Sequence, residues 1–355
     1  MNLKTILALS VALCAGQTMQ AQFECATNAD GTGVTITGYI PVSGGVNIPT
    51  NINGLPVTSI GNDAFADDQI ITSVVIPFGV TSIGNAAFAS CTSLTSITIP
   101  DSITSIGQVA FVDCFSLTAI SIPTSVTSIA ETTPVAAEAG LVFCGCANLT
   151  AITVDTNNPV YSSVNGVLFN KSQTVLIECP GTVAGNYAIP SGVTTVGDFA
   201  FEECDSLTTV AVPSSVTSIG DYAFYECGDL TGIYFAGNAP AANSTAALGE
   251  GNATAYYLPG TTGWNSTFAG CLAVMWLPPP SVIQTTDGGF GIRNNKFGFN
   301  ISGPVNVPVV LEACTNLANP VWTSLLTARL TNGSFYFSEP LQTNVAGRYY
   351  RIGWP

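Results

Sequence analysis

The amino-acid sequence predicts a solenoid of stacked coils, built from short parallel strands and short helical turns, followed by a small all-β domain. Five stretches share one wording, of which VTSIGNAAFASCTSLTSITIP is an example, and they begin at Val57, Val80, Ile103, Val193 and Val216. The first three follow one another at a step of 23 residues, as do the last two. A fixed period of this length is typical of coils that share one continuous core. The 35 Gly and 21 Pro residues agree with a fold rich in turns.

Each repeat contains a short strand. In the second copy Leu94, Ile97 and Ile99 follow an LxxIxI spacing, in which the two isoleucines share one face of an extended segment. Pro100 then ends the strand. Stacked coils would pair these strands into a parallel sheet with a Leu/Ile row inside and a Ser/Thr row outside.

The second limb of each repeat is expected to be helical. In the same copy Gly84 marks a turn, and the spacing of Ala87, Phe88 and Cys91 suits one or two helical turns with the phenylalanine pointing inward. A helix of this length is not stable alone. The sequence therefore predicts that stacking holds it in place.

The repeat unit xVTSIGxxAFxxCxSLTxIxIP resembles the leucine-rich repeats of the BspA-like family, which occurs in secreted and surface proteins of bacteria. The resemblance covers residues 57–236 and implies a leucine-rich-repeat solenoid. In the first copy Asp68 replaces the cysteine, which fits an end coil that is partly open to water. Residues 155–192 resemble a variant coil, with a hairpin predicted from 167–169 and 174–177.

The amino-terminal residues precede the repeats and have two parts. Residues 1–21 are predicted to be a secretory signal peptide, because Lys4 is followed by an apolar run and the small residue Ala21. This predicts a secreted or cell-surface protein. Residues 22–56 contain alternating apolar side chains, and we expect them to form a β cap over the open edge of the first coil.

The carboxyl-terminal residues also divide into two parts. Residues 237–280 lose the period and gain Trp264 and Trp276, which predicts a closing cap followed by a proline-rich linker. Residues 281–355 contain alternating runs such as SFYFSEP and RYYRIGW, which predict a small β module. This module resembles the carboxyl-terminal module of many secreted proteins of Gram-negative bacteria. The resemblance implies no activity, but it makes the module a candidate for surface attachment.

The charge distribution excludes several partners. The formal net charge is −15, and residues 22–280 hold 19 acidic residues but only one basic residue, Lys171. Phosphate contacts need clusters of Lys and Arg, so we expect no nucleic-acid binding. No apolar stretch reaches the roughly 20 residues of a membrane-spanning helix, so we expect no integral membrane span.

Catalytic and metal-binding residues are not found in the sequence. The chain has no histidine, which removes the triads that depend on it and His-ligated zinc. Acidic residues are absent from the predicted outer face of the sheet and gather on the other limb, where solvation is favoured and cation or basic-partner binding stays open. We therefore predict no catalytic residue, no cofactor and no metal site. The candidate binding face consists of Ser73, Ser96, Thr98, Ser121, Thr153, Thr209 and Tyr234.

The repeat places cysteines in a column. Ten cysteines follow the predicted signal peptide, and five of them lie three residues after the repeat's phenylalanine. Coils about 4.8 Å apart would bring Cys91 near Cys114, and Cys204 near Cys227, within the range of disulfides. Parallel side chains and the usual burial of free cysteine favour thiols. Both alternatives remain open from the sequence.

These observations favour a non-catalytic binding or adhesion protein that contacts an extracellular protein or glycan. BspA-like proteins include adhesins, which is what the resemblance implies. One alternative is a structural envelope protein whose repeats space or display the carboxyl-terminal module. A more remote alternative is a carbohydrate-active enzyme that uses two carboxylates.

Overall fold

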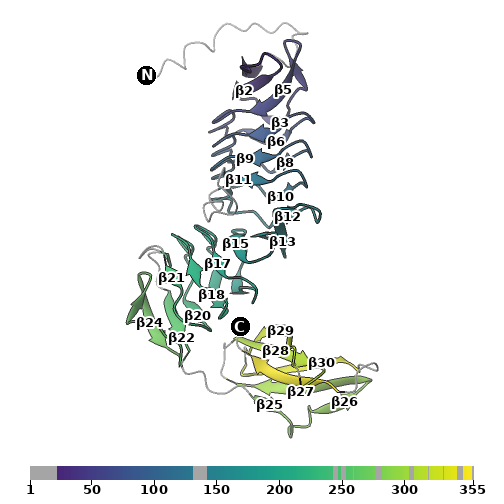
Figure 1. Cartoon of the computed structure of the whole chain (residues 1–355), viewed down its shortest axis with the longest axis vertical. Helices are drawn as coiled ribbons and strands as arrows, with labels where there is room; N and C mark the ends of the chain where they lie inside the picture. The colour runs from purple at the N-terminus through teal and green to yellow at the C-terminus, as the bar shows by residue number, and fades with distance from the viewer. Residues whose placement is uncertain are drawn as a thin grey trace.

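The computed structural model describes residues 22–130, 142–242, 247–248, 253–258, 260–276, 282–303, 308–318, 320–330, 332–341 and 347–353. The predicted signal peptide lies outside the described residues, as do 131–141, in the coil that begins at Val126, and 277–281, around the predicted linker. The described coils stack into an elongated solenoid whose strands run across the stack (Figure 1).

Two parallel ladders run along the first half of the stack (Figure 1). The first ladder joins short strands, three of which end directly before Gly61, Gly84 and Gly107. Its members are β2 (Val34–Tyr39), β5 (Leu55–Ile60), β7 (Ser82–Ile83), β9 (Ser105–Ile106) and β11 (Ser128–Ile129). The second ladder joins the LxxIxI strands. It consists of β3 (Gly44–Asn47), β6 (Ile71–Val75) and β8 (Ser96–Thr98), followed by the pair β10 (Ala119–Ile122) and β12 (Ala151–Val154).

The prediction of helical turns is wrong, since none of the described residues lies in an α-helix. Ala86 and Ser90 have φ angles of 52° and 57°, in the left-handed region. The limb therefore forms consecutive turns, closed by bonds such as Cys91 N to Phe88 O at 3.2 Å. The Phe88 amide donates to the carbonyl of Ala110 in the next coil at 2.9 Å, where a helix would bond within itself. The described part of the chain likewise has no apolar helix of membrane-spanning length.

The segment predicted as an amino-terminal cap adopts the conformation of a coil. Strand β2 pairs in parallel with β5, and β3 pairs in parallel with β6, so both ladders begin inside residues 22–56. The edge of the first ladder is covered by β1 (Phe23–Thr27), which is antiparallel to β2. Strand β4 (Asn51–Ile52) forms a tight hairpin with β5.

A variant coil interrupts the ladders at residues 155–192. Strands β13 (Tyr161–Val164), β14 (Val167–Asn170) and β15 (Val175–Glu178) form an antiparallel meander, as the predicted hairpin required. Strand β15 then pairs in parallel with β17 and restarts the first ladder. The stack changes direction at this coil (Figure 1).

After the variant coil the two ladders continue beyond the last regular repeat. The ladder that β15 restarts continues through β17 (Thr195–Val196), β19 (Ser218–Ile219) and β21 (Ala241–Ala242). The other contains β16 (Gly185–Ala188), β18 (Leu207–Val212), β20 (Gly232–Phe235), β22 (Thr254–Tyr257) and β24 (Cys271–Met275), with β23 (Thr267–Phe268) antiparallel at its end. Residues of the predicted closing cap thus form further coils.

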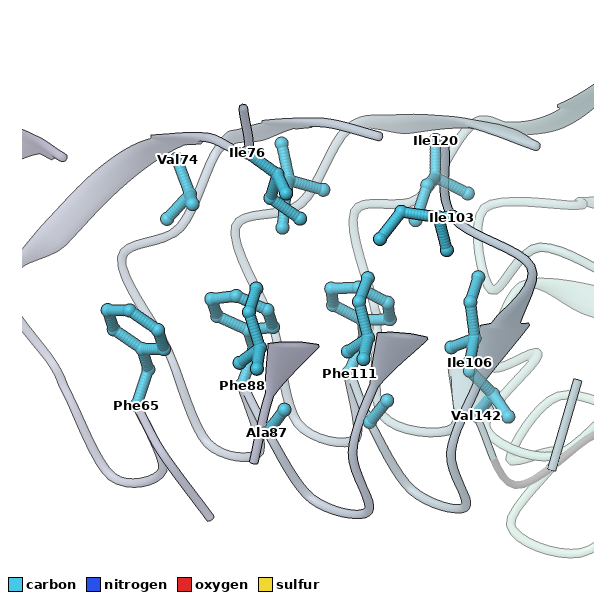
Figure 2. Packing of buried hydrophobic residues seen from close by; sticks show 14 of the residues in the cluster. Phe65, Val74, Ile76, Ala87, Phe88, Ile103, Ile106, Phe111, Ile120 and Val142 are labelled. Atoms are coloured by element: carbon cyan, nitrogen blue, oxygen red, sulfur yellow. The ribbon is translucent and has the colours of Figure 1, made fainter. Parts of the chain in front are cut away.

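The core lies between the ladders and the turns. Phe88 is fully buried, and its ring stacks on Phe65 at 4.9 Å and on Phe111 at 5.5 Å. Figure 2 shows these three rings in one row beneath the aliphatic side chains of the sheet. The buried residues form one cluster before the variant coil and another after it. The predicted inward Leu, Ile and Phe positions of the repeats are therefore core residues.

Residues 282–353 form two antiparallel sheets. One contains β25 (Val282–Gln284), β26 (Gly291–Arg293), β27 (Lys296–Ser302) and β30 (Ser334–Pro340), and the other contains β28 (Pro308–Cys314), β29 (Thr323–Arg329) and β31 (Tyr349–Gly353). A separate small core gathers around Phe299, Ile301 and Leu311. Among the described residues of this region, Arg348 and Glu339 form an ion pair beside Tyr350.

Candidate binding face of the repeat sheet

The candidate residues of the first half lie on the outer face of the LxxIxI ladder. Ser73 and Ser96 are register partners on β6 and β8, and Ser121 and Thr153 are partners on β10 and β12. Thr98 lies opposite Val75. The variant coil separates this group from Thr209 and Tyr234, which lie on β18 and β20. The structure therefore divides the predicted face into two parts.

Two classes of hydroxyl are found along this ladder. The threonine that follows the repeat leucine is used by the stack, since Thr95 donates to Thr72 O at 2.8 Å and Thr118 donates to Thr95 O at 3.3 Å. Ser96, Thr98 and Ser121 are exposed, and no side-chain hydrogen bond to another described residue satisfies them. These three hydroxyls are available to a partner.

The other four candidates are less accessible. Ser73 is half-buried, with its Oγ over Gly45, where a Cβ would lie only 2.6 Å away. Thr153 is exposed, but its hydroxyl donates to Ile120 O at 3.2 Å. The expectation that Thr209 is an outward contact is wrong, because it is only 7% exposed and its hydroxyl donates to Asn186 Oδ1 at 2.9 Å. Tyr234 is half-buried.

Sequence reasoning missed two aromatic residues that join Tyr234. Tyr256 stacks on Tyr234 with ring centroids 4.8 Å apart, and Trp276 meets Tyr234 edge-on at 5.0 Å. The sequence signal was the gain of aromatic residues after position 236, which predicted a closing cap. Loss of the period concealed that β22 extends the same sheet.

The cysteines of the turn limb form a column of buried thiols. The ten cysteines that the structure describes are all free, so neither Cys91 with Cys114 nor Cys204 with Cys227 is a disulfide. The Cys91 thiol donates to Phe65 O of the preceding coil at 3.2 Å. Burial raises the pKa of the Cys91 thiol well above its ordinary range, as a sequestered thiol requires.

Asp68 replaces the first cysteine of that column and does not lie in a wet coil. It is only 3% exposed, and its Oδ1 accepts hydrogen bonds from the Ile70 and Ile71 amides at 3.0 and 3.1 Å. The carboxylate therefore holds the segment that leads into β6. The sequence suggested that this end coil is partly open to water, and the burial of Asp68 shows that this prediction is wrong.

The acids of the turn limb gather beside the variant coil. Glu178, Glu202 and Glu203 line one small cavity together with Cys146 and Cys179. Burial raises the pKa of the Glu178 carboxyl well above its ordinary range, and the nearby Cys204 and Glu202 raise it further. Burial also raises the pKa of Glu202. Within the described residues, no group of three or more Cys, Asp or Glu is arranged to hold a metal ion.

The family model of the BspA type leucine rich repeat region matches residues 58–185 and 183–271, with six copies. The matched residues make up more than half of the chain. The chain belongs to this family. Its match reaches β24, which agrees with the coils that extend beyond residue 236.

Solved structures similar to this BspA-type chain include three bacterial proteins. A leucine-rich repeat protein of T. pallidum is 22% identical, covering 68% of this chain and 86% of its own, with a TM-score of 0.37. The pneumococcal vaccine antigen PcpA is 16% identical, covering 63% and 78%, with a TM-score of 0.45. A leucine-rich repeat protein of Bacteroides capillosus is 29% identical, covering 38% and 94%, with a TM-score of 0.32. No curated protein matches the chain.

Proposed function

We propose that the protein is a non-catalytic binding protein, secreted or held at the cell surface, that contacts an extracellular protein or glycan through the outer face of its repeat sheet. The observation that carries this proposal is the set of exposed hydroxyls of Ser96, Thr98 and Ser121, which have no partner among the described residues. They lie on β8 and β10, strands of successive coils that the bond from Thr118 N to Thr95 O joins at 3.3 Å, and one packed core underlies both strands. Preformed groups cost little ordering entropy when a partner binds.

The distribution of charge supports binding over catalysis. No acidic residue lies in the outward columns of the sheet, which run through Ser73 and Ser96 and through Val75 and Thr98. The described acids of the repeats lie mainly in the turn limb. The whole sequence has no histidine, so general acid–base chemistry at the face would have neither a carboxylate nor an imidazole.

A pair of charge variants tests this proposal. The double substitution Ser96→Arg with Ser121→Arg alters the proposed face, whereas Gln108→Arg with Thr127→Arg places the same charge on exposed positions outside that face, on one of these coils and on the coil that follows it. Each protein, without residues 1–21, is measured for capture of a panel of extracellular matrix proteins and polysaccharides. We expect the first pair to weaken capture at least about tenfold, and the control pair to leave it unchanged.

The same experiment distinguishes a binding protein from the alternative, in which the repeats only space or display the carboxyl-terminal module. Equal effects of the two pairs would contradict a binding role for this face. No capture by the unsubstituted protein, together with release from the cell surface when residues 281–355 are deleted, would favour a display function for the repeats.

A further inference from the structure

Three aromatic side chains lie together at the carboxyl-terminal end of the repeat sheet. We call Tyr234, Tyr256 and Trp276 the aromatic ledge. The two tyrosine rings are nearly parallel, with an interplanar angle of 13° and centroids 4.8 Å apart. Trp276 meets the Tyr234 ring at 62° and 5.0 Å. All three side chains are half-buried, so part of each ring reaches the surface. The aromatic ledge is thus a preformed apolar surface.

Gly232 explains why these rings lie across the sheet. A Cβ at this position would lie 3.1 Å from Cε2 of Tyr234 and 3.2 Å from Cε2 of Tyr256. Without that atom both rings lean over the backbone of β20. Gly232 is the register partner of Thr209 and of Thr254, so the rings cover the middle of the sheet.

On the amino-terminal side of the ledge the surface consists of small and polar side chains. Ala211 is the register partner of Tyr234, and Asn186 is the partner of Thr209. The Asn186 side chain is exposed, and its Oδ1 accepts the hydroxyls of Thr208 and Thr209 at 3.1 and 2.9 Å. These bonds fix the orientation of the amide, and its Nδ2 has no acceptor among the described residues, so two N–H donors are available to a ligand.

On the other side of the ledge the surface is aliphatic. Leu272 is 59% exposed and Val274 is 37% exposed, and both lie on the outer face of β24. The strands β16, β18, β20, β22 and β24 contain no acidic or basic residue. This end of the sheet therefore combines aromatic, aliphatic and amide groups without charge.

We propose that the aromatic ledge binds a neutral polysaccharide, an inference that rests on the proposed function and names its ligand class. A pyranose ring has an apolar face of C–H groups and a rim of hydroxyls, which match the tyrosine rings and the Asn186 amide. An anionic polymer would be repelled by a chain of net charge −15. A basic protein would be drawn to the acidic turn limb, because the ledge offers it no charge.

The turn limb provides a matched control for the aromatic ledge. Phe199 and Tyr222 also stack, with centroids 5.3 Å apart and an angle of 17°, and Tyr222 is 40% exposed. In the sequence Asp198 directly precedes Phe199, and Asp221 directly precedes Tyr222, so this pair has a charged setting. If any exposed aromatic pair could bind sugar, both pairs would contribute to polysaccharide binding. If binding requires an uncharged surface, only the aromatic ledge would contribute.

Affinity gel electrophoresis of the protein without residues 1–21 tests the proposal. Gels contain laminarin, xylan, mannan or hydroxyethylcellulose, with polygalacturonate as the anionic comparison. We expect retardation by at least one neutral polymer and none by polygalacturonate. Tyr234→Ala and Tyr256→Ala should each weaken retardation by about five- to tenfold. Tyr222→Ala and the ring-preserving Tyr234→Phe should leave it within twofold.

The outcomes separate this proposal from the proposed function. Absence of retardation in all four neutral gels, or equal loss in Tyr222→Ala, would overturn the ledge as a polysaccharide site. A dimer in sedimentation that Tyr234→Ala dissociates would assign the ledge to self-association and also overturn it. If polysaccharides fail while the Ser96→Arg and Ser121→Arg pair still abolishes capture of a matrix protein, the proposed function stands and this inference alone is lost. Melting temperatures of all variants establish that each is folded.

Discussion

The coils before the variant coil, which we call the first array, and the coils after it, which we call the second array, have cores built in the same way but differ in the side chains that they expose. Phe88 and Phe201 are both fully buried, and each stacks on the phenylalanine of a neighbouring coil. On the sheet face the first array presents hydroxyls such as Ser96, whereas the second presents the rings of Tyr234 and Tyr256. Stacking therefore fixes the inward positions and leaves the outward ones free to differ. Any functional difference between the two arrays therefore comes from their exposed residues.

The turn limbs differ in the same way. In the first array Asn85 N donates to Asn62 Oδ1 of the preceding coil at 2.8 Å, and the second array makes the same bond from Asp221 N to Asp198 Oδ1 at 2.6 Å. One geometry is thus built from neutral amides in one array and from carboxylates in the other. The fold therefore needs the acceptor oxygen at this position and tolerates the charge.

The largest effect is expected from removing a stacked ring in each array. Phe88→Ala deletes a ring that stacks on both Phe65 and Phe111, and should cost about 3–5 kcal/mol of unfolding free energy, at the upper end of that range. Phe224→Ala deletes a ring with the single ring partner Phe201 among the described residues, and should fall at the lower end. Urea unfolding of both variants measures the difference. A larger loss for the second variant would contradict the continuous stack.

A smaller and equal effect is expected from two glycines of the coils. A Cβ at Gly107 would lie 2.5 Å from the backbone N of Asn85, and a Cβ at Gly220 would lie 2.5 Å from the backbone N of Asp198. Gly107→Ala and Gly220→Ala should each cost about 1–3 kcal/mol, because neighbouring backbones must separate. Thermal unfolding measures both. If only one variant were destabilised, the two arrays would not share the same coil spacing.

The variant coil between the arrays gives the stability a distinct pH dependence. Glu178 is buried, its Oε2 has no hydrogen-bond partner, and burial raises the pKa of its carboxyl. The folded protein thus holds this proton more tightly than the unfolded chain, so stability falls as pH rises from the ordinary glutamate value towards the raised folded value. Glu178→Gln keeps the shape without the charge. It should stabilise the protein by about 1–2 kcal/mol near pH 7 and have little effect near pH 4.

Melting temperatures between pH 4 and pH 8 check this sign. Glu24→Gln, at an exposed position of β1, is the control and should leave the pH profile of the unsubstituted protein unchanged. A glutamine variant that is less stable than the parent near neutral pH would show that the Glu178 carboxylate has a stabilising partner.

The smallest effect is expected from replacing an aspartate of the second array by the asparagine that the first array has at the corresponding position. Asp221 Oδ1 is buried without a hydrogen-bond partner, whereas the corresponding Asn85 Oδ1 accepts from Gln108 N at 2.8 Å. Asp221→Asn should raise the unfolding free energy by about 0.3–0.5 kcal/mol by relieving repulsion from Asp198. The gain should shrink in 1 M salt, as differential scanning calorimetry would show. A salt-independent gain would assign the effect to hydrogen bonding alone.

Much of the interior followed from the sequence, because each coil repeats its inward positions. The burial of Phe88, Leu94 and Ile97 was predicted from spacing alone. The turn limb was not, since the apolar spacing of a short helix and of two successive turns is the same. The left-handed φ angles of Ala86 and Ser90 decide between them, because they direct the amides to the next coil.

The candidate site was predicted only in part. Ser96, Thr98 and Ser121 are exposed as expected, since strand alternation places them outward. Thr209 is buried because Asn186 accepts its hydroxyl and because its register partner Gly232 lies beneath two tyrosine rings. Such contacts between coils depend on which residue occupies the neighbouring strand. The spacing within one repeat does not contain that information.

Hydroxyl-radical footprinting tests most directly whether partners bind the sheet face. Side-chain oxidation is measured with and without a captured ligand at the exposed Val75 and Leu272 and the half-buried Tyr234 of the face, and at the exposed Tyr222 and Phe78, which are not on its strands. We predict that ligand lowers the oxidation of at least one group of face residues and leaves Tyr222 and Phe78 unchanged. Protection of Tyr222 or Phe78 with no change at the face would contradict the account.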